Sequence, residues 1–248
     1  MKILISDLDG TLVFRKDGKP YVSEEDLEAI KRFQKAGNLF GSCTGRGIYF
    51  ACHGCEQVPF DFIIANSGAT LKFGDKAITH GLSMELVNEV VDIYGHDQQY
   101  IFTTPDYAYV FNPDHEWPWE TLDDMARLPD MLEGMSVEYS GDVEKCGKAV
   151  KLLAEKMSGK IGFQQNADSI DIVAYGHSKG TGVREVMEHY GVSIDDIHVI
   201  GDNYNDLPML EASPNSYTVP HAPKEVQEKA AYIVSSVAEC IDMIMKVS

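Results

Sequence analysis

The sequence has few basic residues and no long apolar run, and these two absences exclude broad classes of function. Its 248 residues include 21 Lys and Arg against 39 Asp and Glu, for a formal net charge of −18. Nucleic acids and anionic membranes are bound by basic surfaces, so we expect neither as a partner. The apolar run before Asp7 is too short for a signal peptide or a membrane span. An anionic small substrate is still possible, because a bound metal and a few cations can invert the potential locally.

Cysteine is also sparse, and its count is odd. The five positions are Cys43, Cys52, Cys55, Cys146 and Cys240. This spread suits reduced thiols in a cytoplasmic protein better than a disulfide framework. The segment from Cys52 to Cys55 superficially resembles half of a zinc site, but no second ligand pair follows at a suitable spacing. We therefore expect packed thiols and a cytoplasmic location.

The order of apolar runs and turn signals predicts two parts with different architectures. Strand and helix patterns alternate in the first eighty residues and again after Gly180, which is typical of a doubly wound parallel sheet. In between, strand patterns come in adjacent pairs, which indicates a mostly antiparallel α+β unit. Its predicted helices cover 84–94, a segment from about Leu122, and 143–157. The sequence thus predicts an α/β core from residues 1–80 and 178–248, with an inserted α+β domain at 81–177.

The most informative stretch is the start of the chain, where a short apolar strand leads directly into two carboxylates. Side chains alternate along a strand, so Asp7 and Asp9 would share one face. Two crowded carboxylates repel each other unless a cation or a shared proton is present. The pair fits divalent-metal binding with nucleophilic or acid–base chemistry. From this stretch alone, a solvated turn that closes an ordinary strand is an equal alternative.

Further polar groups follow other predicted strands of the core, and one begins a helix. These are Thr44-Gly45, then Asp202 with Asn205 and Asp206, and finally Lys179-Gly180. Ligands of open α/β sheets bind beyond the carboxyl ends of the strands, so these groups should meet at one edge. The carboxylates suit a hard metal ion, while the hydroxyl, the ammonium and the helix-start amides suit a phosphate.

These motifs, in this order, resemble the four motifs of the haloacid dehalogenase superfamily. They are Asp7-Leu8-Asp9-Gly10-Thr11-Leu12, Thr44-Gly45-Arg46, Lys179-Gly180 and Gly201-Asp202-Asn203-Tyr204-Asn205-Asp206. The last motif is similar to that of the Cof-type hydrolases. Asp7 and Thr44 are 37 positions apart, whereas Thr44 and Lys179 are 135 apart, so a cap domain must lie between the second and third motifs. That arrangement resembles the type-II capped phosphatases of subgroup IIB.

The resemblance implies a role for each motif residue. Asp7 would be the nucleophile that forms an aspartyl-phosphate, and Asp9 would be the general acid and base. Mg²⁺ would bind the carboxylates of Asp7 and Asp202 and the backbone carbonyl of Asp9. The phosphoryl oxygens would be held by Leu8 and Gly45 amides, Thr44, Lys179 and Asn205. Asp206 would orient Lys179 or a metal-bound water.

The resemblance therefore implies a Mg²⁺-dependent phosphatase for small phosphorylated metabolites, with sugar phosphates as the favoured class. We expect a monomer or small homo-oligomer. Phosphomutases of the phosphomannomutase type share this branch and also need both aspartates, so they are an alternative, although the second motif resembles the phosphatase form more. A sugar-phosphate sensor without catalysis is a further alternative, but binding alone would not require Asp9.

Three features stay open at this point. Arg46 could reach the substrate, tie the core to the cap, or form a simple ion pair. His177 could lie on a hinge near the site or be merely exposed. The aromatic cluster Trp117-Pro118-Trp119 could stack on a sugar, although aromatic residues of this kind are more often part of a core.

Overall fold

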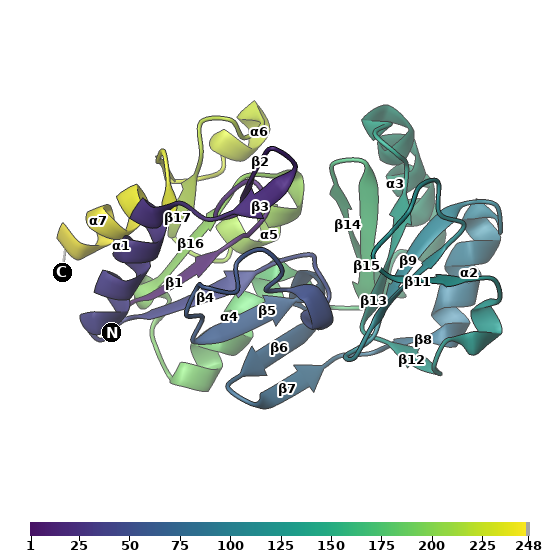
Figure 1. Ribbon diagram of the computed structural model, residues 1–248, viewed down its shortest axis with the longest axis horizontal. Coiled ribbons are helices and arrows are strands. Elements are labelled where there is room, and N and C mark those ends of the chain that lie inside the picture. Colours follow the sequence, from purple (N-terminus) through teal and green to yellow (C-terminus); the bar gives the residue numbers. More distant parts are fainter. Residues whose placement is uncertain (247–248) are drawn as a thin grey trace.

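Two β-sheets organise the chain, and the computed structural model describes residues 1–246 of it. An eight-stranded sheet has the order β18-β17-β16-β1-β4-β5-β6-β7, and a six-stranded sheet has the order β11-β10-β9-β13-β15-β14. The two sheets stand apart in Figure 1, with the six-stranded sheet on the right. Within the described residues, no helix combines the length and apolar character that crossing a membrane requires.

The larger sheet is parallel over six strands. Across the sheet these are β18 (Tyr232–Ile233), β17 (Asn215–Thr218), β16 (Ile197–Gly201), β1 (Ile3–Ser6), β4 (Leu39–Cys43) and β5 (Phe62–Ala65). β6 (Thr70–Phe73) and β7 (Lys76–Thr79) continue it as an antiparallel pair at one edge. Every residue of the central strand β1 is buried, as expected for a parallel sheet that is covered on both faces.

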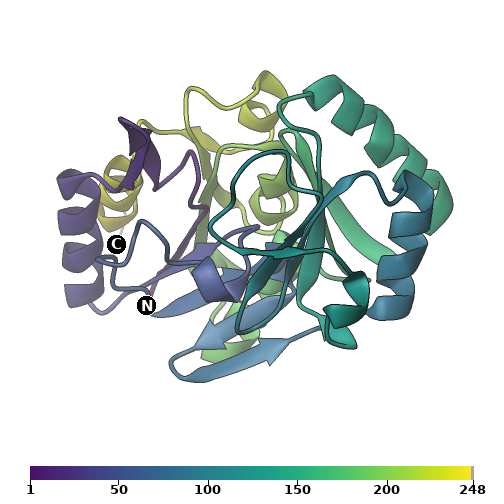
Figure 2. The same cartoon turned by 45° about the vertical axis from the view of Figure 1, so that its right-hand side comes forward.

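Helices cover both faces of this sheet. α1 (Glu24–Lys35) and α7 (Val237–Lys246) lie side by side on one face, where they pack on Leu4 (Figure 2). α4 (Lys179–Tyr190), α5 (Leu207–Leu210) and α6 (Lys224–Gln227) cover the other face, where they pack on Ile3 and Ile5. Ser23 caps the N-terminus of α1, because its hydroxyl accepts a hydrogen bond from the backbone N–H of Asp26. The predicted doubly wound α/β core is confirmed.

The six-stranded sheet lies between β7 and α4 in the chain. Its strands are β9 (Gln99–Thr103), β10 (Ala108–Phe111), β11 (Glu120–Leu122), β13 (Gly134–Glu138), β14 (Ile161–Asn166) and β15 (Ser169–Ala174). All neighbours pair antiparallel except β10 and β11. α2 (Met84–Tyr94) and α3 (Val143–Met157) cover the face that points away from the larger sheet (Figure 1). The small pair β8 (Leu82–Ser83) and β12 (Met131–Leu132) completes this part.

Several local expectations were wrong. The helix predicted from about Leu122 is β11, a 3-10 turn at Met125–Arg127 and β12. The cause is Pro129, which restricts Leu128 to extended backbone and so stops the turn. Between β4 and β5 the expected helix is only a 3-10 turn, Ile48–Phe50. A hairpin, β2 (Phe14–Lys16) and β3 (Lys19–Tyr21), follows the first motif without having been predicted.

Candidate active site

The predicted site residues meet at the carboxyl edge of the parallel strands. Asp7 follows β1, Thr44 follows β4 and Asp202 follows β16, while Lys179 is the first residue of α4. Asp7 continues the sheet, because its N–H donates to the carbonyl of Ile200 at 2.9 Å. A small cavity of about 60 Å³ opens there, lined by Asp7, Asp9, Thr44, Gly45, Arg46, Asn166, Asn203 and Asn205.

Lys179 forms the centre of a buried ionic network. Its Nζ donates to Asp7 Oδ1 and to Asp206 Oδ1, both at 2.6 Å, and its side chain is 0% exposed. The second oxygen of Asp206 accepts the backbone N–H groups of Asp202 and Asn203 at 2.9 and 3.0 Å. The two carboxylates raise the pKa of Lys179 well above its usual value, despite burial. Asp206 therefore fixes both the ammonium and the loop that carries Asp202.

Three carboxylates crowd together beside this ammonium. Oxygen atoms of Asp7, Asp202 and Asp206 all lie within 4.8 Å of one another. Burial, together with the charge of Asp206, raises the pKa of Asp7 well above its usual value and raises that of Asp202 as well. One ammonium cannot neutralise three carboxylates, and carboxylate oxygens are the donors that hard divalent cations prefer. The donor set therefore fits Mg²⁺, with Asp7 and Asp202 as predicted ligands that the fold brings together.

Gly10 and Thr11 shape the same edge of the cavity. Thr11 Oγ1 donates to Asp202 Oδ1 at 2.8 Å and so orients the carboxylate. Gly10 has a φ of +88°, and a Cβ there would lie 2.5 Å from Asp202 Oδ2. Only glycine allows this approach in a left-handed conformation. Both residues belong to the first motif, but no local pattern in the sequence predicted their contact with Asp202.

Asp9 is held by Arg46. Nε and Nη2 of Arg46 donate to the two carboxylate oxygens of Asp9 at 2.7 and 2.6 Å. Nη1 donates to the backbone carbonyls of Ala51 and His53, so the guanidinium is anchored from both sides. The Arg46 side chain is 13% exposed, whereas that of Asp9 is 59% exposed. Of the alternatives for Arg46, the structure has the ion pair.

Three of the remaining predicted phosphate contacts, Thr44, Gly45 and Asn205, line the small cavity. Asn205 is buried, and its Oδ1 has no hydrogen-bond partner among the described residues. Thr44 is buried and accepts the N–H of Arg46 at 3.1 Å. The side chain of Leu8 packs in the core, so only its backbone can reach a ligand. His177 lies outside this group of residues.

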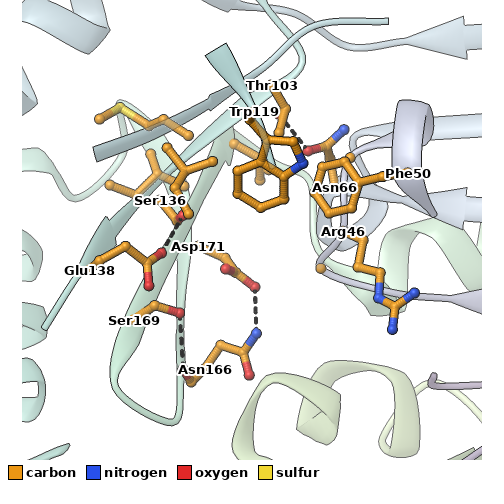
Figure 3. A pocket seen from close by; sticks show the side chains of 16 residues that line it. Arg46, Phe50, Asn66, Thr103, Trp119, Ser136, Glu138, Asn166, Ser169 and Asp171 are labelled. Carbon is orange, nitrogen blue, oxygen red and sulfur yellow. Dashed lines mark hydrogen bonds between the residues drawn. The ribbon is translucent and has the colours of Figure 1, made fainter. Parts of the chain in front are cut away.

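A second cavity of about 170 Å³ adjoins the small one and lies between the two sheets (Figure 3). Gly45, Arg46 and Asn166 line both cavities. The six-stranded sheet contributes Glu138 and Asp171, which point into the space. Burial raises the pKa of Asp171 to about 6 and that of Glu138 to about 7. No sequence signal marked these two acids, because their partners are far away in the chain.

Aromatic rings close one end of the larger cavity. Phe50, from the turn after β4, lies 4.9 Å from Trp119, measured between ring centroids. Trp119 also stacks on Trp117, again at 4.9 Å. Of the aromatic cluster noted in the sequence, Trp119 therefore lines the cavity, and it lies next to Asn66 in Figure 3.

Comparison with known proteins identifies the family. The model of the haloacid dehalogenase-like hydrolases matches residues 4–247. The chain belongs to the haloacid dehalogenase-like hydrolase family. It is 25% identical to the 5-amino-6-(5-phospho-D-ribitylamino)uracil phosphatase YwtE of Bacillus subtilis, over 99% of this chain and 98% of the relative. It is 23% identical to the pyridoxal phosphate phosphatase YbhA of Escherichia coli, over 94% and 93%.

Solved structures of the family share the fold. A HAD/COF-like hydrolase from Plasmodium vivax superposes with a TM-score of 0.85 at 20% identity, over 100% of this chain and 96% of that one. The subclass IIB sugar phosphatase BT4131 superposes with a TM-score of 0.81 at 20% identity, over 100% and 98%. The family match and the phosphatase relatives along the whole chain make the protein a HAD-type phosphatase. The predicted family and enzyme class are confirmed.

Proposed function

We propose that the protein is a Mg²⁺-dependent phosphatase that hydrolyses small phosphorylated metabolites, sugar phosphates in particular, through an aspartyl-phosphate on Asp7. The observation that carries this proposal is the placement of Asp7. Its carboxylate lies at the wall of a small polar cavity, fixed by Lys179 at 2.6 Å, with Asp9 in the same cavity. A nucleophile that a buried ammonium holds in place and an acid–base group thus share one small cavity.

In the first half of the reaction, a carboxylate oxygen of Asp7 attacks phosphorus while the bond from phosphorus to the ester oxygen breaks. Asp9 gives its proton to that oxygen, and the alcohol leaves. In the second half, Asp9 takes a proton from a water molecule, whose oxygen attacks phosphorus. The bond to Asp7 then breaks, and inorganic phosphate leaves with both carboxyl groups restored. The hydrogen bond from Lys179 keeps Asp7 oriented throughout.

Charge stabilisation comes from the groups around the small cavity. The Thr44 hydroxyl, the Asn205 amide and the backbone N–H of Gly45 can hold phosphoryl oxygens as charge spreads over them. Lys179, which contacts Asp7, and the backbone N–H of Leu8, which follows Asp7 in the chain, would add to this. When bound by Asp7 and Asp202, Mg²⁺ would add positive charge at this edge. The ion pair with Arg46 stabilises the ionised form of Asp9, which the second half of the reaction uses. Because the Asp9 side chain is exposed, separating this ion pair costs little free energy.

We propose that residues 81–177 act as a cap that supplies the contacts for the leaving group. Among the residues that line the larger cavity, Arg46 is the only cation, and it is paired with Asp9. Glu138 and Asp171 can accept hydrogen bonds from hydroxyl groups, and Phe50 and Trp119 can pack on the apolar face of a sugar ring. Such a cavity favours neutral polyols and sugars over leaving groups that carry a second negative charge.

Asp7→Asn tests the nucleophile. We expect the variant to lose Mg²⁺-dependent release of inorganic phosphate from an aryl phosphate while it stays folded, as its circular-dichroism spectrum would show. Asp75→Asn, on the exposed turn between β6 and β7, is the matched control and should retain full activity. Appreciable turnover by purified Asp7→Asn would refute the role of Asp7. Conversion of a hexose phosphate to its isomer without phosphate release would instead identify a mutase.

The cellular setting is also part of the proposal. Four of the five cysteines are buried, and burial raises the pKa of Cys55 to about 12 and that of Cys146 to about 11. Thiols of this kind are unreactive and need no disulfide, which supports a cytoplasmic location. Cell fractionation tests the location, and sedimentation tests the predicted monomer or small homo-oligomer.

A further inference from the structure

Two histidines and a glutamate meet where the chain passes between the two sheets. His80 follows β7 on the way out of the larger sheet, and His177 precedes α4 on the way back. Glu185 lies two turns into α4. The two imidazole rings stack with centroids 3.9 Å apart and planes 17° from parallel. Both connections between the sheets are thus in contact with each other and with the core helix α4 (Figure 1).

The ligand atoms of the three side chains lie close to one another. His80 Nε2 lies 3.3 Å from a Glu185 oxygen, and His177 Nδ1 lies 3.9 Å from one. One ligand atom from each of the three residues falls within 4.8 Å of the others. His177 Nδ1 is buried and has no hydrogen-bond partner among the described residues. A buried ring nitrogen without a partner is costly, so a ligand at this point would satisfy it.

The surroundings of His177 favour its neutral ring. Burial, and then the neighbouring His80, lower the pKa of His177, while Glu185 opposes them. A neutral ring keeps the lone pair that a metal ion needs. Two imidazoles and one carboxylate are a donor set for zinc-like ions, whereas Mg²⁺ prefers oxygen donors alone.

We propose that His80, His177 and Glu185 form a second metal site, which binds a divalent transition-metal ion of the zinc class. Ligands at about 2.1 Å around a tetrahedral ion lie about 3.4 Å from one another. Because an imidazole binds a metal ion in the plane of its ring, one of the two stacked rings has to turn out of the stack as the ligand atoms close around the ion. His80 and Glu185 are 32% and 29% exposed, which leaves room for that movement and for a water molecule as the fourth ligand. The bound ion would fasten both connecting segments to α4, the helix that begins with Lys179.

Cobalt(II) is the probe for this site, because its visible absorption is strong in a tetrahedral nitrogen-containing site and weak in an octahedral oxygen site. The titration is carried out on the whole protein in excess Mg²⁺, which occupies the carboxylate site of Asp7 and Asp202. We expect one equivalent of Co²⁺ to give intense visible bands, and Zn²⁺ to displace it. His177→Ala should weaken binding by more than the roughly 10–100-fold that the loss of an outer-sphere partner costs.

Controls separate a lost ligand from a damaged fold. Glu185→Gln keeps the volume of the side chain, and Glu188→Gln is an exposed control on the same helix. His96→Ala, on the surface after α2, is the control for the histidine variants. Loss of the bands in His177→Ala and Glu185→Gln, with their retention in both controls, would support the site. Equal bands in all four variants, or none in the wild type, would overturn it. Since the readout needs no turnover, its failure leaves the phosphatase proposal untouched.

Discussion

Replacing Lys179 by Met should cost the protein both stability and activity, and the stability loss should depend on pH. Lys179 is 0% exposed and donates to two carboxylates that are 8% and 0% exposed. Met has a similar length but no charge, so Asp7 and Asp206 would remain buried without their partner. Removing one member of a buried ion pair typically costs about 3–5 kcal/mol, because the other charge is left unpaired.

The sign of the pH dependence follows from Asp7. Its pKa in the folded protein is well above that of the unfolded chain, so the folded state holds a proton that the unfolded state has released. Stability therefore falls as pH rises from the pKa of Asp7 in the unfolded chain to its pKa in the folded protein. Lys179 opposes the rise, and its own raised pKa keeps it charged at neutral pH. Without Lys179 the pKa of Asp7 in the folded protein should rise further, so stability should fall over a wider pH range. The stability lost in Lys179→Met should therefore be smaller at pH 5 than at pH 8.

Urea unfolding at pH 5 and pH 8, with and without Mg²⁺, measures this effect. We expect Mg²⁺ to recover part of the loss at pH 8, since the ion neutralises the same carboxylates. Lys229→Met, which removes an exposed partner of Glu211 at 3.2 Å, should change stability by no more than about 0.5 kcal/mol. A loss below about 1 kcal/mol, or an equal loss at both pH values, would refute the reasoning. Aryl phosphatase activity should fall by about 100-fold or more.

Three smaller predictions follow from other contacts of the two cavities. Arg46→Lys gives up the two-pronged contact with the proposed general acid, so kcat should fall at least tenfold while the urea midpoint shifts by less than about 1 kcal/mol; an unchanged kcat would contradict the role. Asp171→Asn removes a carboxyl whose pKa rises from 3.8 to about 6, so it should stabilise the protein at pH 8 by at most about 3 kcal/mol and have little effect at pH 4; a gain confined to pH 4 would be the wrong sign. Gly10→Ala places a Cβ against Asp202 in a left-handed backbone conformation, so it should weaken the apparent Mg²⁺ affinity. Gly37→Ala is the control: its backbone is also left-handed but no atom lies near the new Cβ, so it should affect stability alone.

Local patterns in the sequence determined much of the fold. The helices at 84–94 and 143–157 have the bounds that the sequence predicted. Such segments are decided by near neighbours, because their hydrogen bonds and apolar stripes repeat over a few residues. Where a local signal was misjudged, as before Pro129, the element was wrong.

The sequence by itself also determined the reaction class, because each motif is a short run of neighbouring residues that can be recognised without knowing its distant partners. It did not determine how the motifs touch. Lys179 and Asp7 are 172 positions apart, and Arg46 and Asp9 are 37 apart. Only the tertiary structure decided that one ammonium contacts two carboxylates and that Asp9, the proposed general acid, is paired with Arg46. The acids of the larger cavity and the His80–His177 stack depend in the same way on the packing of distant segments, for which a single sequence carries no local pattern.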